Sequence, residues 1–140
     1  MSDRLFLDTN ILVYAYDKHE PNKQRKAQKL LIEGIAQENL FLSVQVLGEF
    51  SNVITRHIPR PMTPDEAQEI IMMLSILPIQ EIDLTIVDRA IDTHKLYQIY
   101  CWDALIISAA ERARCTMILS EDLSDGQIYH DISVNNPFSK

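Results

Sequence analysis

Four acidic residues, far apart in the sequence, each stand in or directly after a stretch with the pattern of a core strand or helix. They are Asp8, Glu49, Asp103 and Asp122. Carboxylates that share one site repel one another, so a cation has to neutralise them. Oxygen ligands of this kind suit Mg²⁺ or Mn²⁺, and two such ions can activate water and stabilise the leaving oxygen of a phosphodiester. If the fold gathers these acids, the expected chemistry is metal-assisted phosphodiester hydrolysis without a Ser or Cys nucleophile.

Short apolar stretches that alternate with helical patterns supply the elements that must position these acids. Strands are expected at 4–7, 40–43, 79–82 and 116–119, with a fifth at the edge, 132–134. Helices are expected at 11–16 with Thr9 and Asn10 as the cap, at 21–38, 44–56 and 64–77, from Asp83 or Thr85 to about 97, and from about 102 onward. The alternation predicts an α/β fold, a three-layer α/β/α sandwich with a central mostly parallel sheet of four to five strands.

The carboxyl ends of the strands are where a sheet of this kind binds its ligands. Asp8 follows the first strand directly and Asp122 follows the fourth after two residues, so both lie at this edge. Glu49 lies in the second turn of the helix entered from the second strand, and Asp103 lies in the first turn of a nearly all-apolar helix. Each acid alone also has a structural interpretation, as a turn residue, a cap or a surface charge. On topology alone the two interpretations weigh about equally.

The composition excludes several classes of protein. The 140 residues, 46% hydrophobic and 24% charged, predict a single domain spanning 1–140. No apolar run approaches the ~20 residues of a membrane span, and the first residues do not resemble a secretory signal. We therefore expect a cytoplasmic protein with no membrane partner. Cys101 and Cys115 are too few for a disulfide framework and are expected to be small buried apolar residues.

The formal net charge of -7 argues at first against a nucleic-acid partner. Without the four acids of the candidate site, however, 16 acidic residues face 13 basic ones, and bound divalent ions would reverse the local sign. A basic stretch follows the first acid, and it is equally consistent with RNA phosphate contacts and with a solvated helix face. It comprises Lys18, Lys23, Arg25, Lys26 and Lys29.

Several other side chains lie close to the predicted site in the sequence. Trp102 precedes Asp103 and has the chemistry to stack on a base, but its place beside a buried helix favours a packing role. Tyr97 and Tyr100 are candidates for a protein–protein face. His94 falls on an apolar helical stripe and is expected in the core.

Four sequence blocks around the acids resemble those of PIN domains, the PilT N-terminus family of nucleases. The blocks are LDTNIL at 7–12, SVQVLGEF at 43–50, WDALI at 102–106 and LSEDL at 119–123. They occur in the family's order and spread across nearly the whole chain. Asp-Thr-Asn alone is a weak signal, but the four blocks together with the predicted strand ends are fairly specific.

The resemblance implies a ribonuclease that depends on Mg²⁺ or Mn²⁺, with the family's acidic quartet at the four residues named above. By the same resemblance, Thr9 and Asn10 orient the first acid and the Ser120 hydroxyl supports the metal site. Small members of this length are commonly VapC-like toxins, which form homodimers and are held inactive by a small antitoxin whose peptide fills the active groove. Asp125 adds either a further metal ligand or, as the preferred interpretation, a turn residue before Gly126.

Two alternatives remain from the sequence. The first is a catalytically silent domain of the same fold that binds RNA or a protein, which gains little because all four acids are present. The second is a small-molecule phosphohydrolase with an aspartyl nucleophile. Such enzymes usually carry an Asp-x-Asp pair after the first strand, and Asn10 at the second position counts against it.

Overall fold

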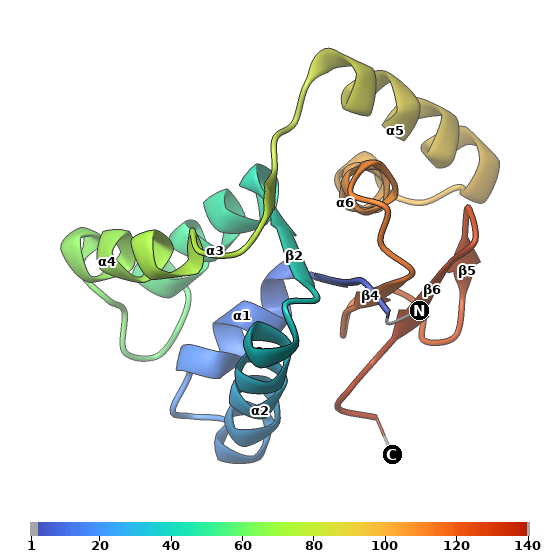
Figure 1. Ribbon diagram of the computed structural model, residues 1–140. Coiled ribbons are helices and arrows are strands. Elements are labelled where there is room, and N and C mark those ends of the chain that lie inside the picture. Colours follow the sequence, from blue (N-terminus) through green and yellow to red (C-terminus); the bar gives the residue numbers. More distant parts are fainter. Residues whose placement is uncertain (1–2, 140) are drawn as a thin grey trace.

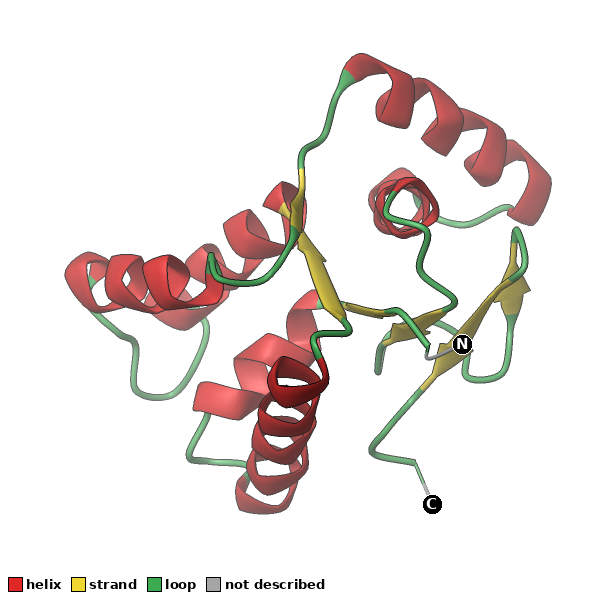
Figure 2. Ribbon diagram, viewed as in Figure 1, coloured by secondary structure: helices red, strands yellow, loops and turns green. Residues whose placement is uncertain are grey.

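The structure is a computed structural model that describes residues 3–139. Its centre is a six-stranded sheet in the order β3-β2-β1-β4-β6-β5, flanked by helices (Figures 1 and 2). Every neighbouring pair is parallel except β5 with β6. The strands are β1 (Leu5–Leu7), β2 (Leu40–Ser43), β3 (Ile79–Gln80), β4 (Met117–Leu119), β5 (Ile128–Tyr129) and β6 (Ile132–Asn135).

Six helices connect the parallel strands and form two outer layers. They are α1 (Thr9–Tyr16), α2 (Pro21–Gln37), α3 (Val44–Arg56), α4 (Pro64–Leu74), α5 (Leu84–Tyr97) and α6 (Cys101–Arg112). From β1 to β3 the chain moves outward in one direction, and it then returns to β4 on the other side of β1. Because parallel crossovers are right-handed, this reversal puts α5 and α6 on the face opposite α1–α4, as Figure 1 shows. The point of reversal lies between β1 and β4.

Short polar residues fix where most of these helices begin. Ser43 caps α3 by accepting from the amide of Val46, and Asp83 caps α5 by accepting from the amide of Ile86. Thr63 and Glu66 form a reciprocal capping box at the start of α4. The expected cap of α1 was wrong by one residue, because the side chain of Asp8 itself accepts from the amide of Thr9 and the helix begins there.

The sheet has more strands than the four to five that the sequence pattern predicted. The sheet has six strands because a two-residue strand, β5, pairs antiparallel with β6. The turn between them places His130 and Asp131 at positive φ, which non-glycine residues adopt infrequently, so no glycine marks the hairpin. β3 is only two residues long, and α4 ends at Leu74 instead of continuing to 77.

The inner strands and the sheet-facing sides of the helices form one main core. Phe6, Leu42, Ile107 and Ile118 are fully buried in it. Gly34 lets α2 approach the sheet closely, because a Cβ at that position would lie 2.3 Å from Cγ of Leu40. None of the helices formed by residues 3–139 is long and apolar enough to cross a membrane.

Candidate active site

The four predicted acids line one cleft at the carboxyl edge of the sheet. The cleft has a volume of about 290 Å³ and opens beyond the ends of β1 and β4, at the point where the strand order reverses. This is where open α/β sheets bind ligands. Its walls are formed by Asp8, Thr9, Glu49, Asn52, Val53, Asp103, Ile106 and Asp122. Residues from four separate parts of the chain therefore meet here as the spacing predicted.

Asp8 is the most buried of the acids, at 7% exposure. Its Oδ1 accepts from the backbone amide of Thr9 at 2.8 Å, and its Oδ2 accepts from the Ser120 hydroxyl at 2.8 Å. The Ser120 Oγ in turn accepts from the amides of Asp122 and Leu123, each at 3.1 Å. Ser120 thus connects the first acid to the loop that carries the fourth.

Glu49 is held from two sides on the second turn of α3. The Thr9 hydroxyl donates to its Oε1 at 2.7 Å, and the Gln45 amide approaches its Oε2 at 3.4 Å. The side chain of Thr9 therefore orients Glu49, while only its backbone contacts Asp8. Gln45 was not singled out from the sequence, and only its position one turn before Glu49 on α3 connects it with the site.

Asn10 contacts the loop that carries Asp122 and not the cleft acids themselves. Its Oδ1 accepts from the amide of Glu121 at 3.1 Å, which holds the loop after β4. Within residues 3–139 its Nδ2 is buried and has no acceptor. Asn10 therefore positions the loop that carries Asp122, whereas the resemblance implied that it orients Asp8.

The cleft contains carboxylates and no basic side chain among the residues that line it. Burial raises the pKa of Asp8 to about 6, against the hydrogen bonds from Ser120 and Thr9, and the charges of Asp122 and Glu49 raise it further. Burial, together with Asp122 and Glu49, also raises the pKa of Asp103. The protein thus gathers negative charge here without supplying a cation of its own.

A divalent cation fits this donor set by its chemistry. Mg²⁺ and Mn²⁺ prefer carboxylate oxygens, and Mg²⁺ keeps several waters when it binds. As they stand, the described side chains include no group of three His, Cys, Asp or Glu that would hold an ion by itself. An ion in this cleft would accordingly be held by some of the acids and by water.

Asp125 is not brought into the cleft. Its two carboxylate oxygens accept from the backbone amide of Asn136 at 2.9 Å and from the Ser139 hydroxyl at 3.2 Å. These contacts fasten the turn that contains Gly126 to the last residues of the described chain. The structure therefore agrees with the interpretation of Asp125 as a turn residue.

The five basic residues of the predicted RNA-binding stretch do not share one environment. Lys18, Arg25, Lys26 and Lys29 are exposed, and Lys29 lies 3.8 Å from Glu33. Lys23 is half-buried and pairs with Glu121 at 2.6 Å, beside the hydroxyl of Tyr14. Lys23 thus neutralises the acid next to Asp122, and nothing in the sequence pattern pointed to that pair.

Three expectations about residues near the third acid were wrong. Trp102 is 69% exposed instead of packed, Cys101 is exposed, and His94 is exposed instead of buried in the core. For Trp102 and Cys101 the reason is that the buried run of α6 starts only at Ala104. His94 lies on α5, where the buried residues are Ile86, Ala90 and Thr93. Cys115 is buried as expected, and burial raises the pKa of its thiol to about 12.

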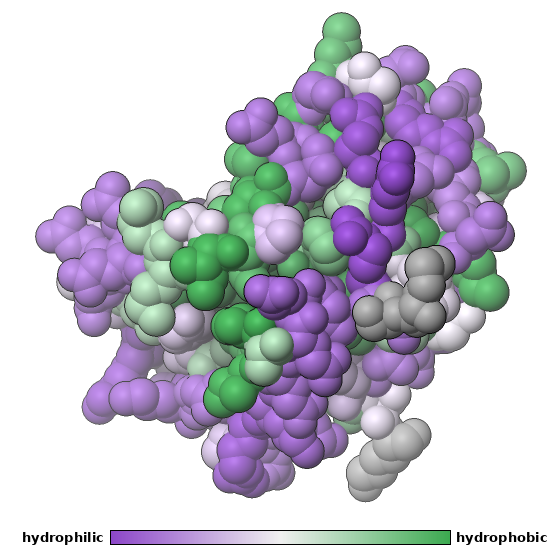
Figure 3. All heavy atoms as spheres, viewed as in Figure 1, coloured by the Kyte–Doolittle hydropathy of each residue, from purple (hydrophilic) through white to green (hydrophobic). Residues whose placement is uncertain are grey.

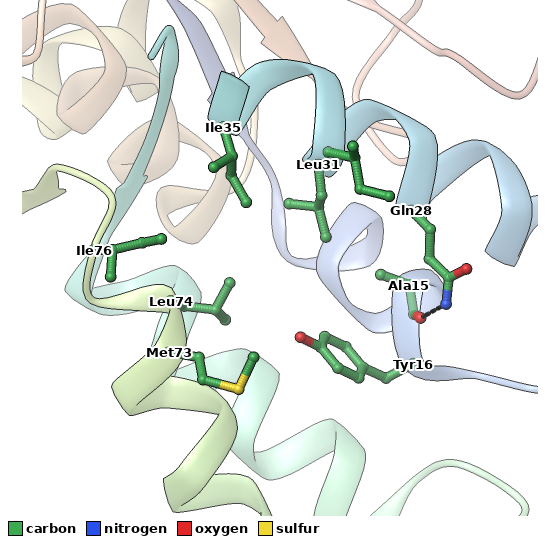
Figure 4. A pocket seen from close by; sticks show the side chains of 9 residues that line it. Ala15, Tyr16, Gln28, Leu31, Ile35, Met73, Leu74 and Ile76 are labelled. Carbon is green, nitrogen blue, oxygen red and sulfur yellow. Dashed lines mark hydrogen bonds between the residues drawn. The ribbon is translucent and has the colours of Figure 1, made fainter. Parts of the chain in front are cut away.

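A second hollow, of about 420 Å³, has the opposite character. It lies between α1, α2 and α4, and Figure 4 shows the side chains of Leu31, Ile35, Met73 and Leu74 facing into it. On the face drawn in Figure 3, apolar side chains gather between α2 and α4. Ile32 and Ile76, which also line the hollow, are among the most exposed large apolar residues of the described chain.

Comparisons with known proteins agree with this architecture. The family model described as the PIN domain matches residues 5–124. A toxin–antitoxin complex from Klebsiella pneumoniae contains a similar chain, with 19% identity, a TM-score of 0.71 and coverage of 97% of this chain and 99% of that one. VapBC2 from Rickettsia felis, bound to a DNA fragment from its promoter, has 22% identity and a TM-score of 0.65, with coverage of 94% and 97%. VapC20 from Mycobacterium tuberculosis, a toxin that cleaves the sarcin–ricin loop, has 13% identity and a TM-score of 0.65, with coverage of 84% and 89%. The comparison with curated proteins gave no match.

Proposed function

The chain belongs to the PIN domain family, and from this premise we propose that it is a metal-dependent ribonuclease, the toxin of a toxin–antitoxin pair. PIN domain nucleases generally use divalent metal ions. The observation that carries the proposal is the cleft in which four carboxylates meet without a basic side chain in its walls. A bound Mg²⁺ or Mn²⁺ would supply an activated water and stabilise the leaving oxygen of an RNA phosphodiester.

The residues of the chain have distinct tasks in this proposal. Asp8, Glu49, Asp103 and Asp122 are the catalytic and metal-holding acids. Ser120 and Thr9 keep the first two acids in place, since their hydroxyls donate to Asp8 and Glu49. Asn10 holds the loop of Asp122 through the amide of Glu121. Outside the cleft, RNA phosphates are proposed to contact four exposed bases, Lys18, Arg25, Lys26 and Lys29. Once the acids of the cleft hold metal ions, they no longer repel the RNA backbone.

The test is cleavage of single-stranded RNA by the purified protein. We expect cleavage with Mg²⁺ or Mn²⁺, none in EDTA, and recovery when the ion is added back. Asp8→Asn should abolish it, and Asp125→Asn is the matched control because Asp125 lies outside the cleft. Binding of RNA without cleavage, with any divalent ion, would contradict the proposal and favour the silent RNA-binding module.

The small-molecule phosphohydrolase has little structural support. It would need a second acid where Asn10 stands, and the side-chain oxygen of Asn10 is already used to hold Glu121. Hydrolysis of a generic phosphate ester without any cleavage of RNA would nevertheless restore it.

A small antitoxin is the proposed protein partner. We further propose that the chain is a single domain, that it forms a homodimer, and that the antitoxin binds this homodimer in the cytoplasm. Two observations support the partner. Similar chains occur in solved toxin–antitoxin complexes, and the exposed apolar hollow between α1, α2 and α4 offers a surface that a partner segment would cover. Induced expression should halt growth, Asp8→Asn should relieve the arrest, and co-expression of a small neighbouring reading frame should relieve it for the unaltered chain. Growth that continues with the unaltered chain would contradict the toxin role.

A further inference from the structure

An aromatic surface adjoins the acidic cleft at the start of α6. Tyr100 and Trp102 are 80% and 69% exposed, although residues 104–110 of α6 are buried. Between them and the end of α5 lies a hollow of about 540 Å³ whose walls include His94, Ile99 and Asp103. Asp103 also lines the acidic cleft. The two depressions therefore share one wall.

The backbone of this aromatic surface is tied to the catalytic acids. The Gln45 amide donates to the carbonyl of Trp102 at 3.1 Å and also approaches Oε2 of Glu49. Asp103 directly follows Trp102, so the first turn of α6 carries an acid into one depression and an indole beside the other. A ligand that occupies the cleft and extends past Asp103 would meet the aromatic rings next.

We propose that Tyr100 and Trp102 form a stacking subsite for a nucleobase of the single-stranded RNA substrate, next to the phosphodiester held in the cleft. This inference rests on the proposed function and adds a part of the substrate to it. Exposed aromatic rings bind single-stranded nucleic acid by stacking, because every base offers a flat apolar face. The base is uncharged, so it suits a surface whose only acid, among the residues that line the hollow, is Asp103.

A second copy of this chain is the competing occupant of the same surface. Leu84, Val87 and Ile91 form an exposed apolar row on α5, and a homodimer would cover such residues. The shared wall at Asp103 favours RNA, because it makes the aromatic surface continuous with the site where the phosphodiester is expected. The two occupants predict different results for the same substitution.

The sequence offers a direct probe, because Trp102 is the only tryptophan. A mixed pool of 2′-O-methyl RNA hexamers is titrated into the full chain with Ca²⁺, which binds carboxylate oxygens and so neutralises the cleft, while the tryptophan fluorescence is followed. We expect quenching that saturates with RNA concentration. Hexamers of the same length built from abasic nucleotides should give none, because they offer phosphates but no base.

Kinetics with cleavable RNA provide the second measurement. Trp102→Ala should raise KM about tenfold, a size typical of losing one base–aromatic stack, and leave kcat within a factor of about two. Trp102→Phe should restore most of the loss because it keeps an aromatic face, and Tyr100→Ala should give a smaller increase. Met72→Ala is the control, an exposed apolar residue on α4 in the other helix layer. The exposure of Trp102 makes retained folding the expected result, checked by circular dichroism.

The outcomes separate this inference from the function on which it rests. If the chain cleaves RNA but the hexamers do not quench and KM is unchanged in Trp102→Ala, the subsite is wrong and the ribonuclease stands. If the chain cleaves no RNA, the proposed function fails and the quenching titration still decides whether bases stack here. If Trp102→Ala turns a dimer into a monomer in sedimentation while RNA affinity is unchanged, the surface belongs to a second copy and the inference is overturned.

Discussion

Two polar clusters of this molecule differ in whether a basic side chain pairs with their carboxylates. On the face covered by α5 and α6, Glu111 accepts two hydrogen bonds from the Arg89 guanidinium, at 2.9 and 3.0 Å, and this pairing lowers its pKa. The same guanidinium reaches Nδ1 of His130, whose Nε2 lies 2.9 Å from the Thr93 hydroxyl. The described residues that line the cleft include no basic side chain, and burial raises the pKa of Asp8 there to about 6.

The difference distinguishes carboxylates that are paired within the protein from those to which we assign a function. The cluster around Arg89 is complete within the protein, and it fixes the β5–β6 hairpin to α5. The loop after β4 shows the same distinction within two residues, since Glu121 is paired with Lys23 while its neighbour Asp122 faces the cleft. Glu121 is thus neutralised by a base, whereas the described residues that line the cleft with Asp122 include none, as the proposed metal site would require.

The largest contrast should appear when one glutamate of each cluster loses its charge. Glu49→Gln should reduce RNA cleavage more than about 100-fold, because removing a ligand costs more than the 10- to 100-fold typical of its supporting partners. Glu111→Gln should leave the rate within a factor of about two. Initial rates at saturating Mg²⁺ or Mn²⁺ measure both. Equal losses of cleavage rate in the two variants would contradict the proposed difference between the clusters.

The Ser120 hydroxyl, which donates to a cleft acid, should matter for cleavage, whereas a similarly buried hydroxyl elsewhere should not. Ser120→Ala removes the donor to Asp8 and the acceptor for two backbone amides, so cleavage should fall by roughly 10- to 100-fold. Ser108 supplies the control because its hydroxyl is buried and, within residues 3–139, has no hydrogen-bond partner. Ser108→Ala should change neither activity nor stability appreciably. A rate in Ser120→Ala equal to that of Ser108→Ala would show that this network is not needed.

The raised pKa of Asp8 makes a prediction about stability with a definite sign. A carboxyl whose pKa is about 6 in the folded state and near 3.8 when unfolded favours folding while protonated, and this contribution is lost as the pH rises through 6. Without metal, Asp8→Asn should therefore be more stable than the unaltered chain at pH 7.5, by roughly 3 kcal/mol. The gain should vanish near pH 4. Urea unfolding in EDTA at the two pH values measures it, and a loss of stability at pH 7.5 would contradict the electrostatic account.

The smallest effect is expected in the neutralised cluster. Arg89 and Glu111 are 41% and 34% exposed, so water and salt screen their attraction. Glu111→Gln should lower the free energy of unfolding by about 0.5–1 kcal/mol, and the difference should shrink in 1 M salt. Its sign is opposite to that of Asp8→Asn at neutral pH. A stabilising Glu111→Gln would mean that both clusters carry unfavourable charge.

Much of the cleft could be predicted because the ends of the strands and the sequence spacing determine where the backbone of each acid lies. Asp8 and Asp122 follow β1 and β4, and parallel strands bring their ends together regardless of side-chain detail. The exposure of Trp102 could not be predicted, because a place beside the buried run of α6, which begins at Ala104, does not decide which way a residue in the first turn faces. The pairing of Lys23 with Glu121 joins residues 98 apart, and the β5–β6 hairpin depends on left-handed His130 and Asp131. Local sequence patterns predict neither this ion pair nor this hairpin.

The cleft acids have no basic side chain beside them among the described lining residues, and we propose that a divalent ion binds there instead. Calorimetric titration of Mn²⁺ into the metal-free chain at pH 7.5 tests it most directly, with Asp8→Asn and Glu111→Gln measured alongside. We predict saturable binding to the unaltered chain, at least tenfold weaker binding to Asp8→Asn, and unchanged binding to Glu111→Gln. Mn²⁺ that binds all three proteins equally, or that fails to bind the unaltered chain, would contradict the account.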